Sequence, residues 1–157
     1  MEKLYKLLWV VLSALIIAFD QYTKYLVMQK INFLSGIKIT GFFNLINMHN
    51  TGAAFSFLAA ESGWQNLFFI ILAMVATVFL LGWLWRLKKN QKLTSLAISL
   101  ILAGAIGNLI DRLFRGFVVD FLDFHWHMYH WPAFNVADGA ITIGALLLLL
   151  SFVKENR

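Results

Sequence analysis

Residues 64–85 read WQNLFFIILAMVATVFLLGWLW, and no Asp, Glu, Lys or Arg interrupts them. A run of about 20 apolar residues is long enough to cross the hydrocarbon core of a bilayer as a helix. Only helices and closed barrels cross that core, because each backbone N–H and C=O must find its hydrogen-bond partner within the protein. The run therefore predicts a transmembrane helix.

Three further apolar segments lie on either side of this run, at about residues 7–28, 93–110 and 137–153. Together the four segments predict an all-α membrane protein with four transmembrane helices in a single domain, residues 1–157. The first segment also resembles a secretory signal, since Lys3 and Lys6 precede it. No small-x-small cleavage site follows, and apolar residues resume beyond Asp20, so we expect a retained first span.

The composition excludes an ordinary soluble domain. Hydrophobic residues make up 61% of the chain, charged residues 13%, and the mean hydropathy is +0.74. Cysteine is absent, which excludes disulfides, a thiol nucleophile and a cysteine-ligated metal. The isoelectric point is about 9.6, but the basic residues form no stripe with interleaved aromatic residues, so we expect no nucleic-acid partner.

The basic residues predict the topology instead. Eight of the thirteen Lys and Arg residues fall on one side of a four-span arrangement: Lys3, Lys6, Arg86, Lys88, Lys89, Lys92, Lys154 and Arg157. Loops rich in Lys and Arg stay in the cytoplasm. We therefore expect both termini inside, and the long connections at about 29–63 and 111–136 outside.

The first of these outer connections contains two short alternating stretches. They are Ile37–Thr40 and Phe43–Asn47, with Gly36 and Gly41 as breaks. Such a pattern is typical of a strand pair. We expect a small extracytoplasmic β element in this connection.

Four aspartates lie at or near the ends of apolar segments: Asp20, Asp111, Asp120 and Asp138. A charged side chain at the centre of a bilayer costs about 2.5–3.5 kcal/mol. In the predicted topology, all four converge on the outer leaflet. Ionisable groups held beside a membrane usually serve a function, so this convergence predicts a functional site.

Several of these positions also have a purely structural interpretation. Asp20 and Lys24 are spaced i,i+4 and can form a structural ion pair on one helix face. Asp138 can satisfy free amides at the start of a helix. The segment Asn50–Phe55 can be a plain turn, since Gly52 and its small neighbours allow close backbone approach.

The end of the third segment carries small and polar residues together. Gly104 permits close helix packing, and Asn108, Asp111 and Arg112 fall at i, i+3 and i+4 on one face. Such a face suits a lined cavity as well as it suits simple exposure. We expect no metal site, although the spacing of His125, His127 and His130 is compatible with zinc, because no HExxH helix is present and the segment is rich in Trp and Tyr.

Five motifs occur in order along the chain. They are D-x-x-T-K at Asp20–Lys24, N-T-G-A-A-F at Asn50–Phe55, G-x-x-G-N-x-x-D-R at Gly104–Arg112, V-V-D-F at Val118–Phe121 and F-N-x-A-D at Phe134–Asp138. Each motif is short, but the ordered set covers nearly the whole chain. In this respect the sequence resembles the bacterial lipoprotein signal peptidases (signal peptidase II).

The resemblance implies an aspartic endopeptidase with Asp120 and Asp138 as the catalytic pair. It would cleave the signal peptide from diacylglyceryl-modified prolipoproteins just before the lipidated cysteine. The resemblance also assigns substrate-binding or supporting roles to Asn50, Gly52, Gly104, Asn108, Asp111, Arg112, Asn135, Asp20 and Lys24. It implies no cofactor and no metal. It further implies a monomer in the bacterial inner membrane, an active site near the outer leaflet, and lipid-modified prolipoproteins and membrane lipids as partners.

The chemistry of the residues agrees with this assignment. Two carboxylates a few ångströms apart cannot both ionise cheaply, so they share a proton. An ion-coupled transporter would instead need polar residues at mid-membrane, and the inner halves of the second and third segments carry almost none. A membrane scaffold that uses small residues for helix contacts does not explain why positions 120 and 138 are both carboxylates.

Overall fold

The computed structural model describes residues 2–52 and 64–155. It contains four long helices: α1 (Glu2–Lys30), α2 (Trp64–Arg86), α3 (Lys92–Arg115) and α4 (Val136–Glu155). All four are long and apolar enough to cross a membrane. The third helix runs past residue 110, where the apolar segment ends, and its last turn therefore carries Asp111, Arg112 and Arg115.

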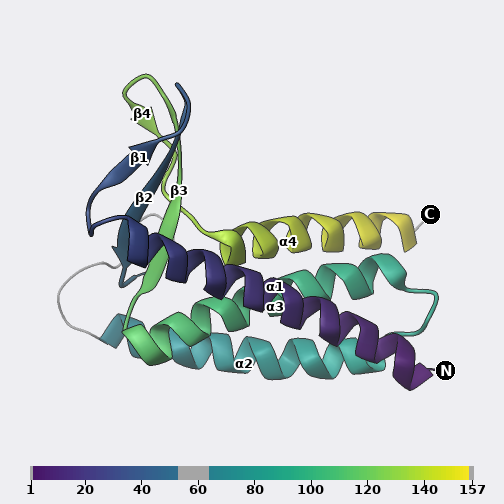
Figure 1. The fold of residues 1–157 in the computed structure, drawn as a ribbon. Coiled ribbons are helices and arrows are strands. Elements are labelled where there is room, and N and C mark those ends of the chain that lie inside the picture. Colours follow the sequence, from purple (N-terminus) through teal and green to yellow (C-terminus); the bar gives the residue numbers. More distant parts are fainter. Residues whose placement is uncertain (1, 53–63, 156–157) are drawn as a thin grey trace.

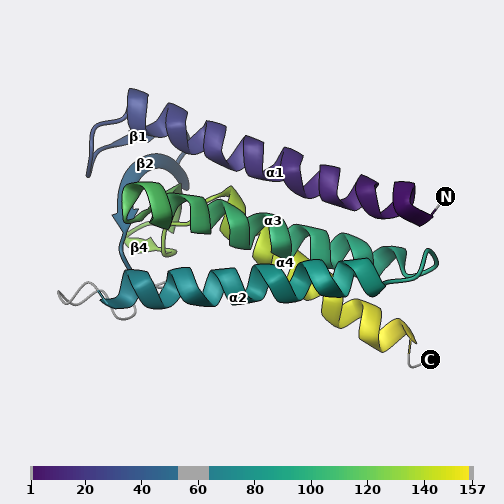
Figure 2. The ribbon, with the colours of Figure 1, turned by 90° about the horizontal axis from the view of Figure 1, so that it is seen from below.

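The helices run side by side, and the two ends of the bundle differ in structure. Both termini and the connection between α2 and α3 lie at one end of the bundle, while the strands gather at the other end (Figures 1 and 2). Polar residues from the ends of α1, α3 and α4 thus meet the strands at a single end of the molecule.

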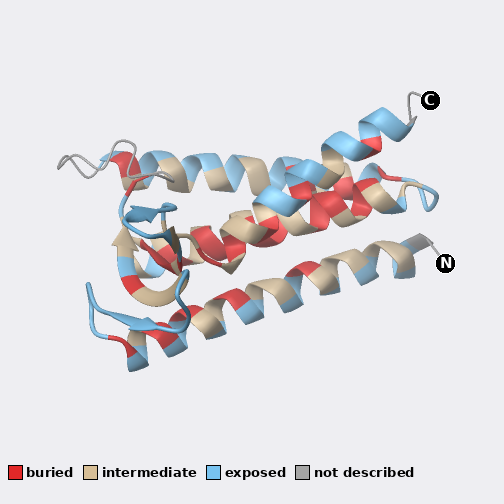
Figure 3. Ribbon diagram, turned by 90° about the horizontal axis from the view of Figure 1, so that it is seen from above, coloured by how far each residue is buried: buried red, intermediate tan, exposed pale blue. Residues whose placement is uncertain are grey.

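The helix α3 occupies the centre of the bundle, as the burial colours in Figure 3 illustrate. In an apolar stretch of 18 residues, 56% of the residues of α3 are buried, compared with 11% in α1 and in α2 and 22% in α4. The outer helices expose large apolar side chains such as Leu8 (61%) and Val78 (72%). A surface of this kind is unsuited to water but is matched by lipid chains.

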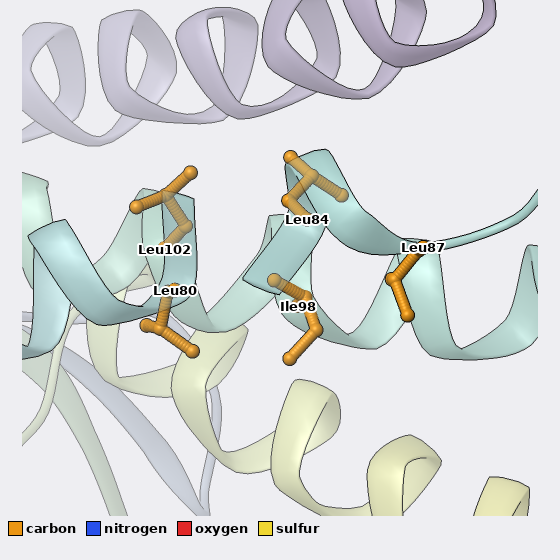
Figure 4. Packing of buried hydrophobic residues seen from close by; sticks show 5 residues of the cluster. All are labelled: Leu80, Leu84, Leu87, Ile98 and Leu102. Carbon is orange, nitrogen blue, oxygen red and sulfur yellow. The ribbon is translucent and has the colours of Figure 1, made fainter. Parts of the chain in front are cut away.

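Leucine and isoleucine side chains hold α2 against α3. Leu80 and Leu84 of α2 pack with Ile98 and Leu102 of α3, and Leu87 closes the cluster just beyond the end of α2 (Figure 4). The four residues on the helices are no more than 7% exposed. This cluster lies towards the end of the bundle that carries the termini, away from the strands.

Small residues bring α3 and α4 into close contact. A Cβ on Gly104 would lie 2.2 Å from the carbonyl oxygen of Ala137, and one on Gly144 would lie 2.8 Å from the carbonyl oxygen of Ala97. Only glycine permits this approach of the two backbones. The contact at Gly104 matters most for the site, because it fixes the first turn of α4.

The strands form one antiparallel sheet in the order β1-β2-β3-β4. Their bounds are Gly36–Lys38, Phe43–Asn50, Val118–Trp126 and Tyr129–His130. The strand pair expected in the first connection is confirmed, and its second strand extends to Asn50. The expectation was too narrow, because the second connection adds β3 and β4. Val118, Val119 and Phe121 favour a strand, but Asp120 interrupts their apolar pattern.

The end of α3 leads directly into the long strand β3. Gly116 adopts a left-handed conformation with φ of 80°, and its N–H donates to the carbonyl of Arg112 at 3.2 Å. This C-terminal cap stops the helix and turns the chain into the sheet. In the ladder between β2 and β3, Asp120 stands opposite Met48. The sheet thus positions Asp120 beside the ends of the helices.

Candidate active site

Asp120 and Asp138, 18 residues apart in the chain, line the same cavity. The cavity has a volume of about 600 Å³, and Asn50, Asn108 and Arg112 also line it. We call it the main cavity. Asp120 comes from the sheet and Asp138 from the first turn of α4, so the site forms only where the sheet meets the helix ends.

Asn135 connects the two carboxylates. Its side-chain amide donates to Oδ1 of Asp120 at 2.7 Å, and its Oδ1 accepts from the backbone N–H of Asp138 at 2.9 Å. The carboxylate of Asp138 in turn accepts from the backbone N–H of Asn135 at 3.2 Å. The last two bonds form a capping box at the start of α4. Asp138 therefore caps its helix and also lines the cavity.

Asp120 is buried, with only 3% of the residue exposed to solvent. Loss of solvent raises the pKa of Asp120 to about 7, and the neighbouring charge of Asp138 adds to the rise. Hydrogen bonds from Asn50 (3.0 Å) and Asn135, and the charge of Lys24, lower it in part. Near neutral pH this carboxyl can hold a proton.

Asp138 is held by the polar face of α3. The amide nitrogen of Asn108 donates to Oδ1 of Asp138 at 2.8 Å. The amide oxygen of Asn108 accepts from the Lys24 ammonium at 3.0 Å. Because Lys24 can only donate, it fixes the orientation of the Asn108 amide. The NH₂ group of Asn108 must then face Asp138.

A network of four charges, three of them fully buried, lies beneath the cavity. Lys24, fully buried, pairs with Asp20 at 2.8 Å and with Asp111 at 2.9 Å, and Arg115 also pairs with Asp111. Asp20 accepts from the backbone N–H of Ala137 at 2.8 Å, and Asp111 from that of Val119 at 3.1 Å. The network therefore anchors both the start of α4 and the start of β3.

Arg112 of α3 also lines the main cavity. Its guanidinium donates to the carbonyl of Gly52 at 3.0 Å and stands 5.1 Å from the ring centroid of Phe69. Its buried Nε–H has no hydrogen-bond partner among the described residues. A buried donor without a partner is costly, so this group is suited to hold a peptide or developing oxyanion that enters the cavity.

The segment Asn50–Phe55 falls partly outside the described residues, since Ala53 and those that follow it to residue 63 are not among them. Its first part forms a turn in which the Gly52 N–H donates to Oδ1 of Asn50 at 3.0 Å. That bond orients the Asn50 amide towards Asp120. The substrate-binding roles that the resemblance implies for Asn50 and Gly52 stay predictions.

His125, His127 and His130 lie in and beside the hairpin formed by β3 and β4. Within the described residues no group of three or more His, Cys, Asp or Glu side chains is arranged to hold a metal ion. Instead, Nδ1 of His130 lies 2.8 Å from Asp123. Sequence reasoning missed Asp123, Gln21 and Arg115. A signal was present in Asp123, because aspartate is rare within strands.

The main cavity combines a polar floor with an apolar flank. The flank continues along α4 through Ile141 and Ile143, and Phe134 also borders it. One carboxyl that can keep its proton near neutral pH stands with a second carboxylate around the same space. Such a pair can activate water and polarise a carbonyl, which is the chemistry of hydrolysis by aspartates.

Comparison with known proteins identifies close relatives. Residues 12–154 match the family model described as signal peptidase (SPase) II. The chain is 50% identical to a lipoprotein signal peptidase of Ralstonia nicotianae, over 95% of this chain and 86% of that protein. It is 47% identical to those of Alteromonas mediterranea (96% and 82%) and Haemophilus influenzae (96% and 86%).

Solved structures share the fold. One bacterial membrane enzyme, determined by the in meso method at 2.3 Å resolution, superposes with a TM-score of 0.84 at 32% identity, covering 94% of this chain and 88% of that one. A second, at 1.9 Å resolution, gives 0.83 at 31% identity, with coverage of 93% and 92%. With four helices able to span a bilayer, this chain is a multi-pass membrane protein.

Proposed function

Because the chain belongs to the signal peptidase II family, we propose that it removes the signal peptide from lipid-modified prolipoproteins by aspartic catalysis. Cleavage falls just before the cysteine that carries the diacylglyceryl group. The observation that carries this proposal is the position of Asp120 and Asp138 on one cavity, tied together by Asn135. The peptidase works without a metal or cofactor in this account, because the two carboxyls supply both acid and base.

The reaction begins with Asp120 protonated and Asp138 ionised. Asp138 removes a proton from a water molecule, the water oxygen attacks the scissile carbonyl carbon, and Asp120 gives its proton to the carbonyl oxygen. The resulting tetrahedral diol collapses when Asp138 passes its proton to the leaving cysteine nitrogen and Asp120 takes one back. Each carboxyl thereby returns to its first protonation state. Positioned acid–base groups of this kind contribute about 10²–10⁴-fold to the rate.

The assignment of roles follows from the hydrogen bonds. The raised pKa of Asp120 favours its protonated form near neutral pH. Asp138 accepts from the Asn108 amide and from the Asn135 N–H, and both donors stabilise a carboxylate. The Nε–H of Arg112, which has no hydrogen-bond partner among the described residues, holds a substrate carbonyl in this scheme.

The apolar flank along α4 explains why the substrate carries lipid. Each acyl CH₂ buried in the bilayer contributes about 0.8 kcal/mol, so the membrane itself concentrates and orients the substrate. The signal helix and the acyl chains remain in the membrane beside Ile141 and Ile143. The scissile bond then reaches the carboxyls without leaving the interface.

The proposed location is the bacterial inner membrane, with a monomer as the working unit. Both termini and the basic loop before α3 face the cytoplasm, as the positive-inside rule requires. The sheet then lies at the outer leaflet, because it occupies the opposite end of the bundle from the termini (Figure 1). The main cavity lies there too, since Asp120 of the sheet and Asp138 at the start of α4 line it.

The direct test uses purified protein and two synthetic lipobox peptides that differ only in the diacylglyceryl group on the cysteine. We expect mass spectrometry to find a signal fragment that ends just before the cysteine, and only from the lipidated peptide. Cleavage at another bond, or equal cleavage of the peptide without lipid, would contradict the proposal.

A further inference from the structure

A second cavity opens beside the main one. We call it the side cavity; its volume is about 540 Å³. The two cavities have five lining residues in common, Asn50, Asp120, Trp131, Pro132 and Ala133. From Asp120 they diverge: the main cavity follows α4, whereas the side cavity follows the sheet to Met48, Asp123 and His130. Asp120 therefore stands where two binding spaces meet.

Asp123 is the second carboxylate of the side cavity, and it is held firmly. Its side chain is 7% exposed, with His130 Nδ1 at 2.8 Å and the Asn44 amide donating at 2.8 Å. Burial alone would raise the pKa of Asp123, but the hydrogen bonds from His130 and Asn44 outweigh it and hold that pKa below its usual value. Asp123 is therefore ionised at neutral pH.

The other residues that line the side cavity do not fully neutralise the negative charge of Asp123. Among the described residues that line the side cavity, none is a lysine or arginine. Burial lowers the pKa of His49, so this histidine is neutral at physiological pH. His130, with a half-exposed side chain, is the partner of Asp123 and can offset its charge only when protonated. The cavity is thus suited to neutral or cationic groups.

The chemistry of a lipidated substrate assigns an occupant to this space, on the premise that the proposed function is correct. The signal helix and the acyl chains are apolar and belong with the main cavity and the bilayer. The charged start of a signal peptide lies in water at the far side of the membrane, so the residues after the lipid-bearing cysteine are the part that leaves for water at the end that carries Asp120. With the scissile bond at Asp120, those residues continue into the side cavity.

We propose that the side cavity binds the first residues of the mature chain after the lipidated cysteine, and that Asp123 disfavours acidic side chains there. Like charges brought together in a partly desolvated site are repelled strongly. Asp123 is therefore a specificity-determining residue outside the catalytic pair. It acts on the peptide side of the substrate, whereas the flank of α4 acts on the lipid side.

The test uses three diacylglyceryl lipobox peptides that differ only at the two positions after the cysteine: Lys-Lys, Ser-Ser and Asp-Asp. We expect kcat/KM for the lysine peptide to exceed that for the aspartate peptide by about 10-fold or more. In Asp123→Asn, which keeps size and hydrogen bonding, the ratio should fall towards one. In His130→Asn, which removes the offsetting partner, the ratio should widen.

The matched control is His127→Asn, in the same hairpin but outside the side cavity. This control should keep the wild-type ratio. Added salt should compress the wild-type ratio by screening, which tests the idea without any mutation. A wild-type ratio near one, or a ratio that Asp123→Asn leaves unchanged, would overturn the inference while leaving the proposed function intact. Failure to cleave any of the lipidated peptides would instead remove the proposed function, and this inference with it.

Discussion

Asp120 shows how the surroundings of one side chain change its chemistry. Burial and the nearby Asp138 raise its pKa to about 7, against the effect of two amide donors. An aspartate in water would be ionised at that pH. The strand around it, Val118 to Phe121, removes the solvent, and the helix end supplies the second charge.

We predict that activity falls on the alkaline side. The active form carries a proton on Asp120, so kcat/KM should decline above about pH 7, by about tenfold per pH unit once the proton is lost. Asn50→Ala should move this decline to higher pH, because the Asn50 hydrogen bond lowers the pKa of Asp120. A pH series with a peptide that lacks titratable groups provides the measurement. A flat profile up to about pH 9 would contradict the assignment.

The same raised pKa links stability to pH. The folded pKa of Asp120 lies above the ordinary value of 3.8, so its contribution to stability is full below 3.8 and is lost as the pH rises through about 7. Asp120→Asn removes this loss. We expect the variant to melt at a higher temperature than the wild type at about pH 8, with the difference shrinking towards about pH 4. Thermal unfolding in detergent at the two pH values measures it, and an unchanged difference would refute the linkage.

Residue patterns predicted some contacts and missed others. The i,i+4 spacing of Asp20 and Lys24 indicated an ion pair, and the pair forms at 2.8 Å. No local pattern indicated that Lys24 would also contact Asp111 and Asn108. Those contacts depend on how α1 packs against α3, which periodicity in one helix does not specify.

Among the contacts between helices, the one between α3 and α4 determines where the first turn of α4 lies. Gly104 lies against the backbone of Ala137, one residue before Asp138. The carboxylate of Asp20 accepts a hydrogen bond from the backbone N–H of Ala137. The position of the Asp138 carboxyl therefore depends on close packing of two helices.

We predict that Gly104→Ala harms both folding and activity. The added Cβ would lie 2.2 Å from the Ala137 carbonyl oxygen, so α4 must shift. Overpacking of this kind typically costs about 1–3 kcal/mol, and a displaced Asp138 should reduce turnover as well. Gly82→Ala is the matched control, because a Cβ there meets nothing within 4 Å. If the two variants showed equal melting temperatures and rates, the account of the α3–α4 contact would be wrong.

The elements themselves were only partly predictable. Long apolar runs gave the four helices, since a membrane leaves few alternatives. The alternating residues 37–47 indicated β1 and β2. The strand β3 was not predicted, because Asp120 interrupts its run of apolar residues. The carboxylate indicated a functional site, and the strand pattern around it was not recognised. Pairing of β2 with β3 joins two distant connections, which only the whole fold determines.

At the scale of the whole molecule, the bundle has two chemically different ends. Both termini occupy one end, and the sheet occupies the other (Figure 2). Lys88 and Lys89 lie in the connection between α2 and α3, at the end of the termini, whereas Asp120 lies in the sheet. The orientation in the membrane decides which side the substrate must reach. The amino-acid sequence predicts this orientation through its basic loops, independently of the fold.

We predict opposite exposure of the two ends in cells. The chain has no cysteine, so single cysteines report cleanly. Thr40→Cys, beyond β1, should react with a membrane-impermeant maleimide in intact spheroplasts, whereas Lys89→Cys, between α2 and α3, should react only after lysis. Reaction of Lys89→Cys in intact spheroplasts would reverse the proposed orientation.

We propose that Asp120 and Asp138 together perform the hydrolysis. The most direct measurement is the cleavage rate of a lipidated lipobox peptide by Asp120→Asn and by Asp138→Asn, in the presence of a metal chelator. Both substitutions keep size and hydrogen bonding but remove the acid–base chemistry. We expect each variant to stay folded and to lose about 10²–10⁴-fold or more in rate, while the wild type keeps its rate in the chelator. Cleavage by either folded variant at close to the wild-type rate would contradict it.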